Sequence, residues 1–160
     1  MKNIAIIGAG LSAPTLATIL KSSANISVFE KSRSVSGRMS TRRAGLYHFD
    51  HGAQFFRAKS PGFKAFIHPM IEQGIIGPWD ARLIELDKTK IVAKRNWGMA
   101  SPHANVEKQE GQSYYMDEKK NFGACGDWCI EGRVEAAFIS GFNLANQLLS
   151  LITKEKVHVE

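Results

Sequence analysis

Cysteine is scarce, and the start of the sequence has no long apolar run. Two cysteines among 160 residues cannot form a disulfide framework, so we expect reduced thiols and a cytoplasmic location. The apolar run at residues 4–7 is far shorter than the roughly 20 residues of a membrane span. Gly8 and Gly10 also interrupt any signal-peptide core. We therefore expect no membrane partner and no secretory leader.

Proline is scarce too, with 5 residues, and the sequence has no internal repeat or low-complexity stretch. A content of 44% hydrophobic and 22% charged residues excludes a disordered or fibrous chain. The length corresponds to about one domain, at roughly 100–200 residues per domain. We expect a single domain with a real hydrophobic core.

Acidic residues are nearly absent between residues 31 and 59, where Asp50 is the only one. The whole chain has a net charge of +6, and this block holds seven basic residues: Lys31, Arg33, Arg38, Arg42, Arg43, Arg57 and Lys59. The block could be a nucleic-acid surface, a site for a ligand phosphate or a solvated face. The sequence shows no nucleic-acid motif, so we expect no nucleic-acid partner. A basic nucleic-acid-binding domain stays as the least favoured alternative.

The first 30 residues have the pattern of a βαβ unit. The β-branched run at residues 3–7 predicts a buried parallel strand that ends in glycine. Apolar spacing at residues 11–21 predicts a helix, in which Pro14 is tolerated because the first turn has no intrahelical N–H bond to lose. Residues 26–30 form a second predicted strand.

The turn of this unit carries a dinucleotide-binding pattern. Gly8 makes the tight turn, Gly10 allows a pyrophosphate to approach the backbone, and Ala13 is small enough for helix–strand packing. The N–H groups at the helix start attract phosphate. Glu30 ends the second strand, where a carboxylate accepts from ribose hydroxyls and disfavours the 2′-phosphate of NADP. A glycine-rich turn without a ligand is the alternative interpretation.

The rest of the chain alternates between helical and strand patterns. Residues 60–74 predict a helix opened by Ser60 and shortened or kinked by Pro69, and residues 79–86 and 90–97 predict two paired strands. Residues 101–120 predict a long loop and residues 122–126 a short strand. Residues 134–152 predict the strongest amphipathic helix, and we expect its apolar stripe, which includes Phe138, to pack on the parallel sheet beside the first helix.

Three separated segments of the sequence resemble motifs of a known protein family. Residues 33–41 resemble the glycine–arginine motif of FAD-dependent amine oxidases, and residues 50–55 look like their next FAD-contacting segment. Residues 126–129, 132–138 and 140–141 are similar to the closing FAD motif of that group. The amino-acid sequences of these segments most resemble those of the renalase-like branch of NAD(P)/FAD-dependent oxidoreductases. The resemblance covers roughly residues 1–100 and 120–150.

The resemblance implies an α/β fold: an FAD/NAD(P)-binding Rossmann-like domain with a parallel sheet and a small β excursion. Residues 1–75 and 120–153 would form this single domain around a reduced middle segment, residues 76–119. The implied cofactor is FAD, with Arg38 near the diphosphate and Asp127 on a ribityl hydroxyl. The full set of expected cofactor-binding residues is Gly8, Gly10, Ser12, Ala13, Glu30, Lys31, Gly37, Arg38, Ala53, Gln54, Asp127, Arg133, Val134 and Glu135.

The implied activity is that of an FAD-dependent oxidoreductase, which takes hydride from an amine or dihydropyridine substrate and passes electrons to oxygen. The middle segment is much shorter than the substrate domain of the family, so the alternative is a catalytically impaired dinucleotide-binding remnant. We expect Trp79 and Trp97 to form an exposed patch that favours a homo-oligomer. Ser36 and Ala13 stand where the family usually has glycine.

Other residue clusters carry weaker signals. Cys125 and Cys129 have no nearby histidine pair, so buried thiols are favoured over a metal site. His48 and His51 flank Asp50 and are interpreted as loop histidines near the cofactor. No Ser-His-Asp or paired-carboxylate arrangement is evident, and no catalytic side chain is assigned.

Overall fold

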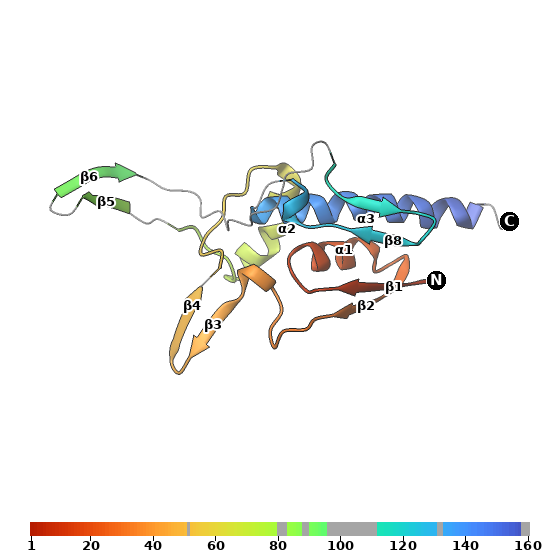
Figure 1. Cartoon of the computed structure of the whole chain (residues 1–160), viewed down its shortest axis with the longest axis horizontal. Coiled ribbons are helices and arrows are strands. Elements are labelled where there is room, and N and C mark those ends of the chain that lie inside the picture. The colour runs from red at the N-terminus through yellow and green to blue at the C-terminus, as the bar shows by residue number, and fades with distance from the viewer. Residues whose placement is uncertain (51, 80–82, 88–89, 96–111, 131–132, 158–160) are drawn as a thin grey trace. The chain divides into compact units, whose positions relative to one another are not determined.

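The computed structural model describes residues 1–50, 52–79, 83–87, 90–95, 112–130 and 133–157 (Figure 1). Two compact units make up the chain. The first contains residues 1–54 and 101–160, and the second contains residues 55–100. The sequence-based prediction of one domain, split at residues 75 and 120, stays a prediction.

The first unit begins with the expected βαβ arrangement. Strand β1 (Lys2–Ile7) leads into helix α1 (Ser12–Leu20), and strand β2 (Ala24–Phe29) pairs in parallel with β1. Because Pro14 lies in the first turn of α1, its missing N–H leaves no helical hydrogen bond unmade. The fold is thus α/β and Rossmann-like, as predicted.

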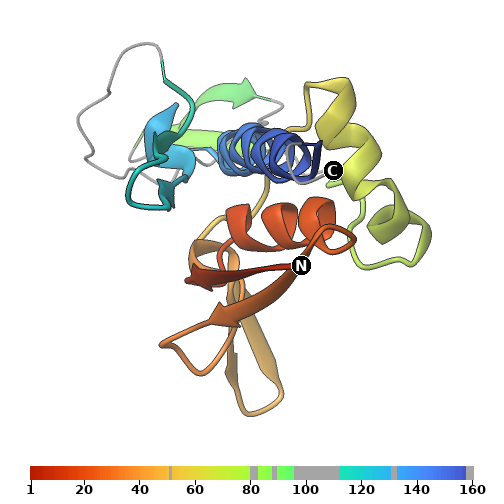
Figure 2. The same ribbon diagram turned by 90° about the vertical axis from the view of Figure 1, so that its right-hand side faces the viewer.

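Helix α3 (Val134–Val157) stacks on α1, and both views place α1 between α3 and the β1–β2 sheet (Figures 1 and 2). The core of this unit is formed by Leu16, Leu20, Ala24, Leu144, Ala145 and Ile152. The sequence analysis expected α3 to pack on the sheet beside α1. That expectation is wrong, because α3 packs against the face of α1 that the sheet leaves uncovered.

The β1–β2 sheet is less buried than predicted. Within the described residues it has two strands, and Ile7 is 83% exposed while Phe29 is 57% exposed. A parallel strand is buried when helices cover both faces of its sheet. Here α1 covers the face that carries Ile4 and Ile26, which pack against the core. The other face is open, so the prediction of a buried strand is wrong.

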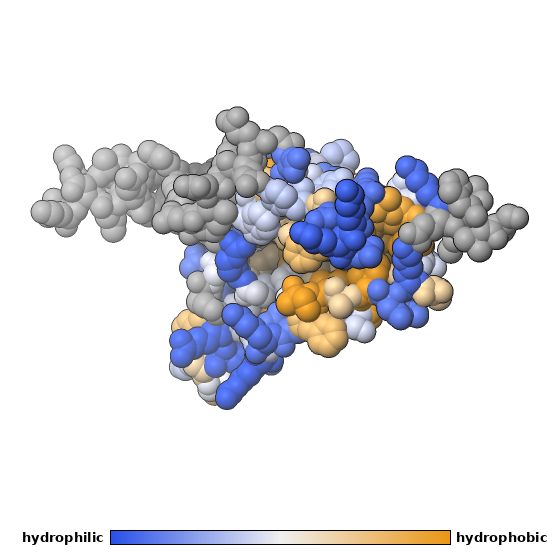
Figure 3. Space-filling model, turned by 45° about the vertical axis from the view of Figure 1, so that its right-hand side comes forward, coloured by the Kyte–Doolittle hydropathy of each residue, from blue (hydrophilic) through white to orange (hydrophobic). Residues whose placement is uncertain are grey.

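Two antiparallel hairpins follow in the same unit. Strands β3 (Thr41–Ala44) and β4 (Tyr47–Asp50) form a hairpin whose residues are all exposed. Hydrophilic side chains dominate it in the lower part of Figure 3. Strands β7 (Tyr115–Asp117) and β8 (Phe122–Ala124) form the second hairpin. The prediction of a loop at residues 101–120 is therefore wrong at residues 115–117, which form β7. Residues 101–111 lie outside the described residues.

Two short 3-10 turns connect these elements to the rest of the unit. The turn η1 (Gly37–Met39) precedes β3, and the turn η2 (Asp127–Cys129) lies between β8 and α3. Each of these two turns belongs to a segment that resembles an FAD-contacting motif, whereas residues 134–138 and 140–141 of the closing motif lie in α3.

The second unit contains helix α2 (Pro61–Glu72) and the antiparallel strands β5 (Leu83–Asp87) and β6 (Lys90–Arg95). The Ser60 hydroxyl accepts a hydrogen bond from the Phe63 N–H and so caps α2, as the sequence predicts. Gly74 follows the helix with a φ of +69°, a conformation that favours glycine. Pro69 does not shorten α2, which continues to Glu72.

Among the residues that the structure describes, one helix is long and apolar enough to cross a membrane by length and composition alone, the stretch Val134–Lys154 of α3. Of its most apolar window, 39% is buried inside the structure. Core helices of globular proteins pass the same test, and α3 supplies Leu144, Ala145 and Ile152 to the core. The expectation of no membrane partner stays a prediction.

Candidate functional site

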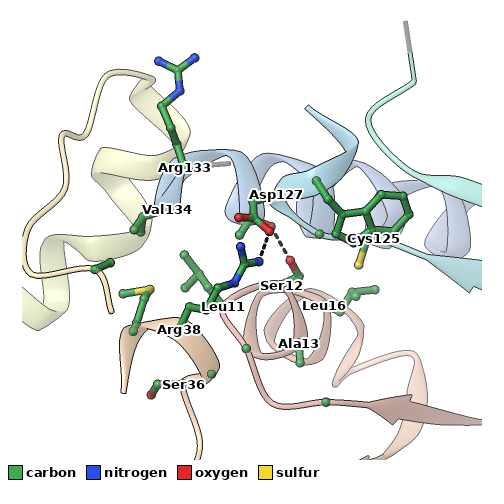
Figure 4. Close-up of a pocket in the computed structure, with 18 of the residues that line it drawn as sticks. Leu11, Ser12, Ala13, Leu16, Ser36, Arg38, Cys125, Asp127, Arg133 and Val134 are labelled. Carbon is green, nitrogen blue, oxygen red and sulfur yellow. Dashed lines mark hydrogen bonds and ion pairs between the residues drawn. The ribbon is translucent and has the colours of Figure 1, made fainter. Parts of the chain in front are cut away.

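A pocket of about 250 Å³ lies in the first unit, where the starts of α1 and α3 meet η1 and η2 (Figure 4). Ten of the predicted cofactor-binding residues line it: Gly8, Gly10, Ser12, Ala13, Gly37, Arg38, Ala53, Asp127, Arg133 and Val134. They come from segments more than 100 residues apart in the chain. The first turns of two helices therefore border one cavity, where unpaired N–H groups and the helix dipoles favour an anion.

The glycine-rich loop has the conformation that its residues suggest. Gly8 has a φ of +94°, which side-chain-bearing residues rarely adopt. Nothing lies within 4 Å of the position that a Cβ atom would take on Gly10, so the space beside its backbone is open. Within the described residues, the N–H groups of Gly10 and Leu11 have no protein acceptor. This loop can accept a phosphate group without rearrangement.

A second loop is joined to the glycine-rich loop. The Ser36 N–H donates to the Ala9 carbonyl oxygen at 2.8 Å. Ser36 adopts a φ of +82°, unusual for a residue with a side chain, at the position where the resemblance to amine oxidases leads us to expect glycine. A Cβ atom on Gly37 would lie 3.5 Å from the Gly10 Cα atom. The two loops therefore form one continuous wall of backbone.

Glu30 lies beside the glycine-rich loop and is bonded to protein groups. Its carboxylate accepts from the Ala9 N–H at 2.6 Å, the Ser32 N–H at 2.8 Å and the Ser32 hydroxyl at 2.7 Å. These bonds, led by the Ser32 and Ala9 amides, lower the pKa of Glu30 from 4.5 to about 2. In the structure Glu30 therefore holds the Ala9 amide at the start of the glycine-rich loop.

Arg38 and Asp127 form an ion pair across the pocket, joining η1 to η2 over 89 residues of sequence. Figure 4 shows the two side chains pointing toward one another, whereas the Arg133 side chain extends away from them. The Asp127 side chain is 5% exposed and the Arg38 side chain is 50% exposed. The pair therefore neutralises a buried carboxylate and leaves half of the Arg38 side chain exposed.

The backbone of residues 52–54 packs closely against the backbone of Arg38. A Cβ atom on Gly52 would overlap the Arg38 carbonyl group, so only glycine fits there. The Ala53 N–H donates to the same carbonyl oxygen at 2.8 Å, which holds Ala53 at the pocket wall. Gln54, the next predicted site residue, is exposed and does not line the pocket.

Three further predicted residues lie outside the pocket lining. Lys31 is exposed, Glu135 is partly buried in the first turn of α3, and Glu30 reaches the site only through Ala9. The pocket lining also includes residues that the sequence analysis did not assign to the cofactor: Ile6, Ile7, Leu11, Leu16, Ser36, Met39, Cys125, Gly126, Trp128 and Ala137. Most of them are near a predicted site residue in the sequence, and this proximity is the signal that could have identified them. His51 and Trp97 lie outside the described residues.

Cys125 lines the pocket and Cys129 lies nearby in η2, and both are protonated thiols at neutral pH. Burial, reinforced by the neighbouring Cys129, raises the pKa of Cys125 to about 11. Burial also raises the pKa of Cys129. Among the residues that the structure describes, no cluster of histidine, cysteine, aspartate or glutamate could hold a metal ion. These thiols therefore contribute to packing rather than nucleophilic chemistry.

A comparison with protein families supports the same assignment for the N-terminal part. Residues 6–68 match the family model of the NAD(P)-binding Rossmann-like domain. The match includes the glycine-rich loop, α1, β2 and η1 and ends within α2, so residues 125–137 of the pocket lie beyond it. At this level the chain has a dinucleotide-binding domain of the kind found in oxidoreductases, and the match does not separate FAD from NAD(P).

Proposed function

We propose that this chain binds FAD in the pocket between α1 and α3 and acts as an FAD-dependent oxidoreductase of the renalase-like or amine-oxidase type. The observation that carries the proposal is the meeting of two helix starts, one glycine-rich loop and Arg38 around a single cavity. The volume of about 250 Å³ is below the roughly 300–1,000 Å³ of drug-sized pockets. A dinucleotide would extend from it along the glycine-rich loop toward Glu30.

The residues fit the adenosine and diphosphate part of such a ligand. The open backbone at Gly10 and the N–H groups of Gly10 and Leu11 suit phosphate oxygens. Glu30 keeps the Ala9 amide in place, and an ionised carboxylate has about four lone-pair sites, so it retains capacity for a ribose hydroxyl. These groups would bind and orient the ligand.

Arg38 and Asp127 support the choice of FAD over NAD. A phosphate that draws Arg38 toward it leaves Asp127 buried and in need of another donor. FAD carries hydroxyl groups on the polyol chain beside its diphosphate, so one ligand can supply both the anion for Arg38 and the donor for Asp127. NAD has a ribose ring with two hydroxyl groups at this place instead of a polyol chain, so the choice of FAD over NAD rests on the family resemblance as well as on this pair.

The start of α3 has a separate role in this proposal. Val134 lines the pocket in the first turn of the helix, where unpaired N–H groups stabilise negative charge. FAD, when bound, supplies the hydride acceptance from an amine or dihydropyridine and the transfer of electrons to oxygen. The chain contributes binding, orientation and a positive helix end.

A visible spectrum tests the proposal directly. The purified chain is incubated separately with FAD, FMN, NAD and NADP, dialysed, and examined for retained ligand. We expect FAD to be retained, with a flavin absorption band that dithionite bleaches and air restores. Arg38→Gln should lower FAD retention, whereas Arg42→Gln, in the exposed hairpin, is the charge-matched control. Retained NAD with no flavin would overturn the proposal.

An oxygen-consumption assay separates the enzyme from the alternative of an impaired dinucleotide-binding remnant. The FAD-loaded chain is given amines and nicotinamide dihydropyridines in turn. Oxygen uptake that depends on a substrate supports the oxidoreductase. FAD binding without any turnover supports the remnant.

A further inference from the structure

Ser140 of α3 is fully buried and joins two other segments through its hydroxyl. The hydroxyl accepts from the Gly126 N–H at 2.9 Å and donates to the Ser113 carbonyl oxygen at 2.5 Å. A helical serine or threonine usually donates back to the carbonyl four residues earlier, as Thr153 does to Leu149. Ser140 instead bonds across the tertiary structure.

The bond to Gly126 acts on the wall of the pocket. Gly126 precedes Asp127 and is the N-cap residue of η2. The backbone conformation of Gly126 therefore determines the direction in which the Asp127 side chain points. A Cβ atom on Gly126 would overlap the Trp128 indole, which shows how closely this turn is packed. Fixing the Gly126 amide therefore fixes the ion pair between Asp127 and Arg38.

The first turns of α3 also contact the start of α1, which forms the opposite wall of the pocket. The Ser12 hydroxyl donates to the Ala137 carbonyl oxygen at 2.8 Å. A Cβ atom on Gly141 would lie 2.7 Å from the Ser12 carbonyl oxygen, so α1 and α3 touch through backbone there. Residues 137–141 of α3 thus hold the start of α1 on one side and the Asp127 turn on the other.

We propose that Ser140 is a positioning residue of the dinucleotide pocket: its hydroxyl holds the Gly126 amide and thereby places Asp127 for the polyol part of the ligand. The inference rests on the proposed function and adds a residue that does not itself line the cavity. Because Ser140 acts on the η2 wall and not on the glycine-rich loop, its loss should affect the two halves of a dinucleotide unequally.

The first test uses the ligand-free protein. Amide hydrogen exchange at Gly126 is compared in the wild-type chain, in Ser140→Ala and in Ser150→Ala, a matched control at an exposed site of the same helix. Loss of a hydrogen bond of ordinary strength should speed exchange at Gly126 about tenfold in Ser140→Ala. Exchange in β1 should stay unchanged, as should all exchange in Ser150→Ala. Unchanged exchange at Gly126 would overturn the positioning role.

The second test compares two ligands. ADP carries the half that reaches the glycine-rich loop, whereas FAD also reaches Asp127. Ser140→Ala should weaken FAD binding about tenfold and ADP binding less than about twofold. Ser140→Cys, which keeps a weak donor and acceptor, should give an intermediate loss and provides a second variant if the alanine variant folds poorly. Equal losses for ADP and FAD would show a general structural role and contradict the inference.

The two tests separate this inference from the proposed function. A wild-type chain that binds no FAD would overturn the proposed function and, with it, the placement of Asp127 for a polyol. Equal losses for ADP and FAD in a chain that does bind FAD would overturn the positioning role of Ser140 and leave the proposed function intact.

Discussion

Two carboxylates near the pocket are stabilised by different means. Glu30 accepts from backbone amides and a hydroxyl at the end of β2, and these neutral donors lower its pKa to about 2. Asp127 is buried and is compensated by the guanidinium of Arg38. Loss of a partner should therefore have different consequences at the two sites, since one depends on local backbone and the other on a distant cation.

The first prediction concerns Glu30 and acid stability. Because its pKa in the fold lies below the ordinary 4.5, the ionised carboxylate adds to the free energy of unfolding above pH 4.5. This contribution is lost as the pH falls toward 2. Glu30→Gln should be less stable than the wild type at neutral pH, and the difference should shrink between pH 4.5 and 2. Denaturant titrations across this range measure it, and a difference that does not vary with pH would contradict the assignment.

The second prediction concerns the asymmetry of the Arg38–Asp127 pair. Arg38→Gln leaves a buried carboxylate without its cation and should cost about 1–3 kcal/mol. Asp127→Asn leaves a half-exposed guanidinium that water can solvate, so it should cost less. The double variant should recover most of the loss caused by Arg38→Gln. Unfolding free energies of the three variants provide the test, and equal costs for both single variants would show that Asp127 is solvated.

At the scale of elements, the contact between α1 and α3 organises the first unit. The apolar stripe of α3 supplies Leu144, Ala145 and Ile152 to the core, and α1 supplies Leu16 and Leu20. The two helices start at the pocket, so their packing also fixes the distance between the two pocket walls. Stability and ligand binding should therefore respond together to changes along this contact.

A third prediction tests the buried face of α3. Phe138 is 5% exposed, whereas Phe142, one turn later, is 42% exposed. Their ring centroids lie 5.7 Å apart, which makes them a matched pair. Phe138→Ala should cost about 3–5 kcal/mol of unfolding free energy, and Phe142→Ala clearly less. A loss below about 1 kcal/mol for Phe138→Ala, a typical single-mutation effect, would place that ring at the surface.

A fourth prediction tests the close approach of the helices at Gly141. In an exposed helix interior, glycine to alanine stabilises by about 1 kcal/mol. Here the new Cβ atom would lie 2.7 Å from the Ser12 carbonyl oxygen, and α1 would have to move. Gly141→Ala should therefore destabilise the protein, by about 1–3 kcal/mol, while Ser150→Ala stays within about 0.5 kcal/mol. Stabilisation by Gly141→Ala in denaturant titrations would refute the contact.

At the scale of the whole molecule, large apolar side chains remain at the surface of each unit. In the first unit Ile7, Val28 and Phe29 lie at the end of the open sheet, and in the second unit Trp79 is 54% exposed. Contiguous exposed apolar surface favours association. Trp97, which the sequence analysis expected to join Trp79, lies outside the described residues.

The fifth prediction follows from this exposure. We expect a dimer or larger assembly in sedimentation. The family resemblance implies a substrate domain that residues 76–119 are too few to form, so we expect turnover of amines and dihydropyridines to be slow, or undetectable if the chain is the impaired remnant. Trp79→Ser should weaken association, with Trp79→Phe as the control that keeps an aromatic surface. A monomer that oxidises such a substrate at about 1 s⁻¹ or faster, the low end of ordinary enzymes, would contradict the prediction.

Sequence alone was sufficient for the elements whose pattern is local. Gly8 and Gly10 between an apolar run and a helical pattern predicted the βαβ unit, and the stripe from Val134 to Ile152 predicted the final helix. The Rossmann-like fold followed from these and is confirmed. Such features depend on backbone conformation and on hydrophobic spacing along one segment, both of which neighbouring residues determine. The identity of the cofactor stays a prediction.

Only the tertiary structure decided which distant groups meet. Arg38 and Asp127 were predicted as separate ligand contacts, and the fold pairs them across 89 residues. Ser140 belonged to a sequence motif, but its bond to Gly126 could not be derived from spacing within α3. The stacking of α3 on α1 likewise depends on the missing side chain of Gly141. A periodic pattern predicts that a face is apolar, whereas packing between elements determines what covers it.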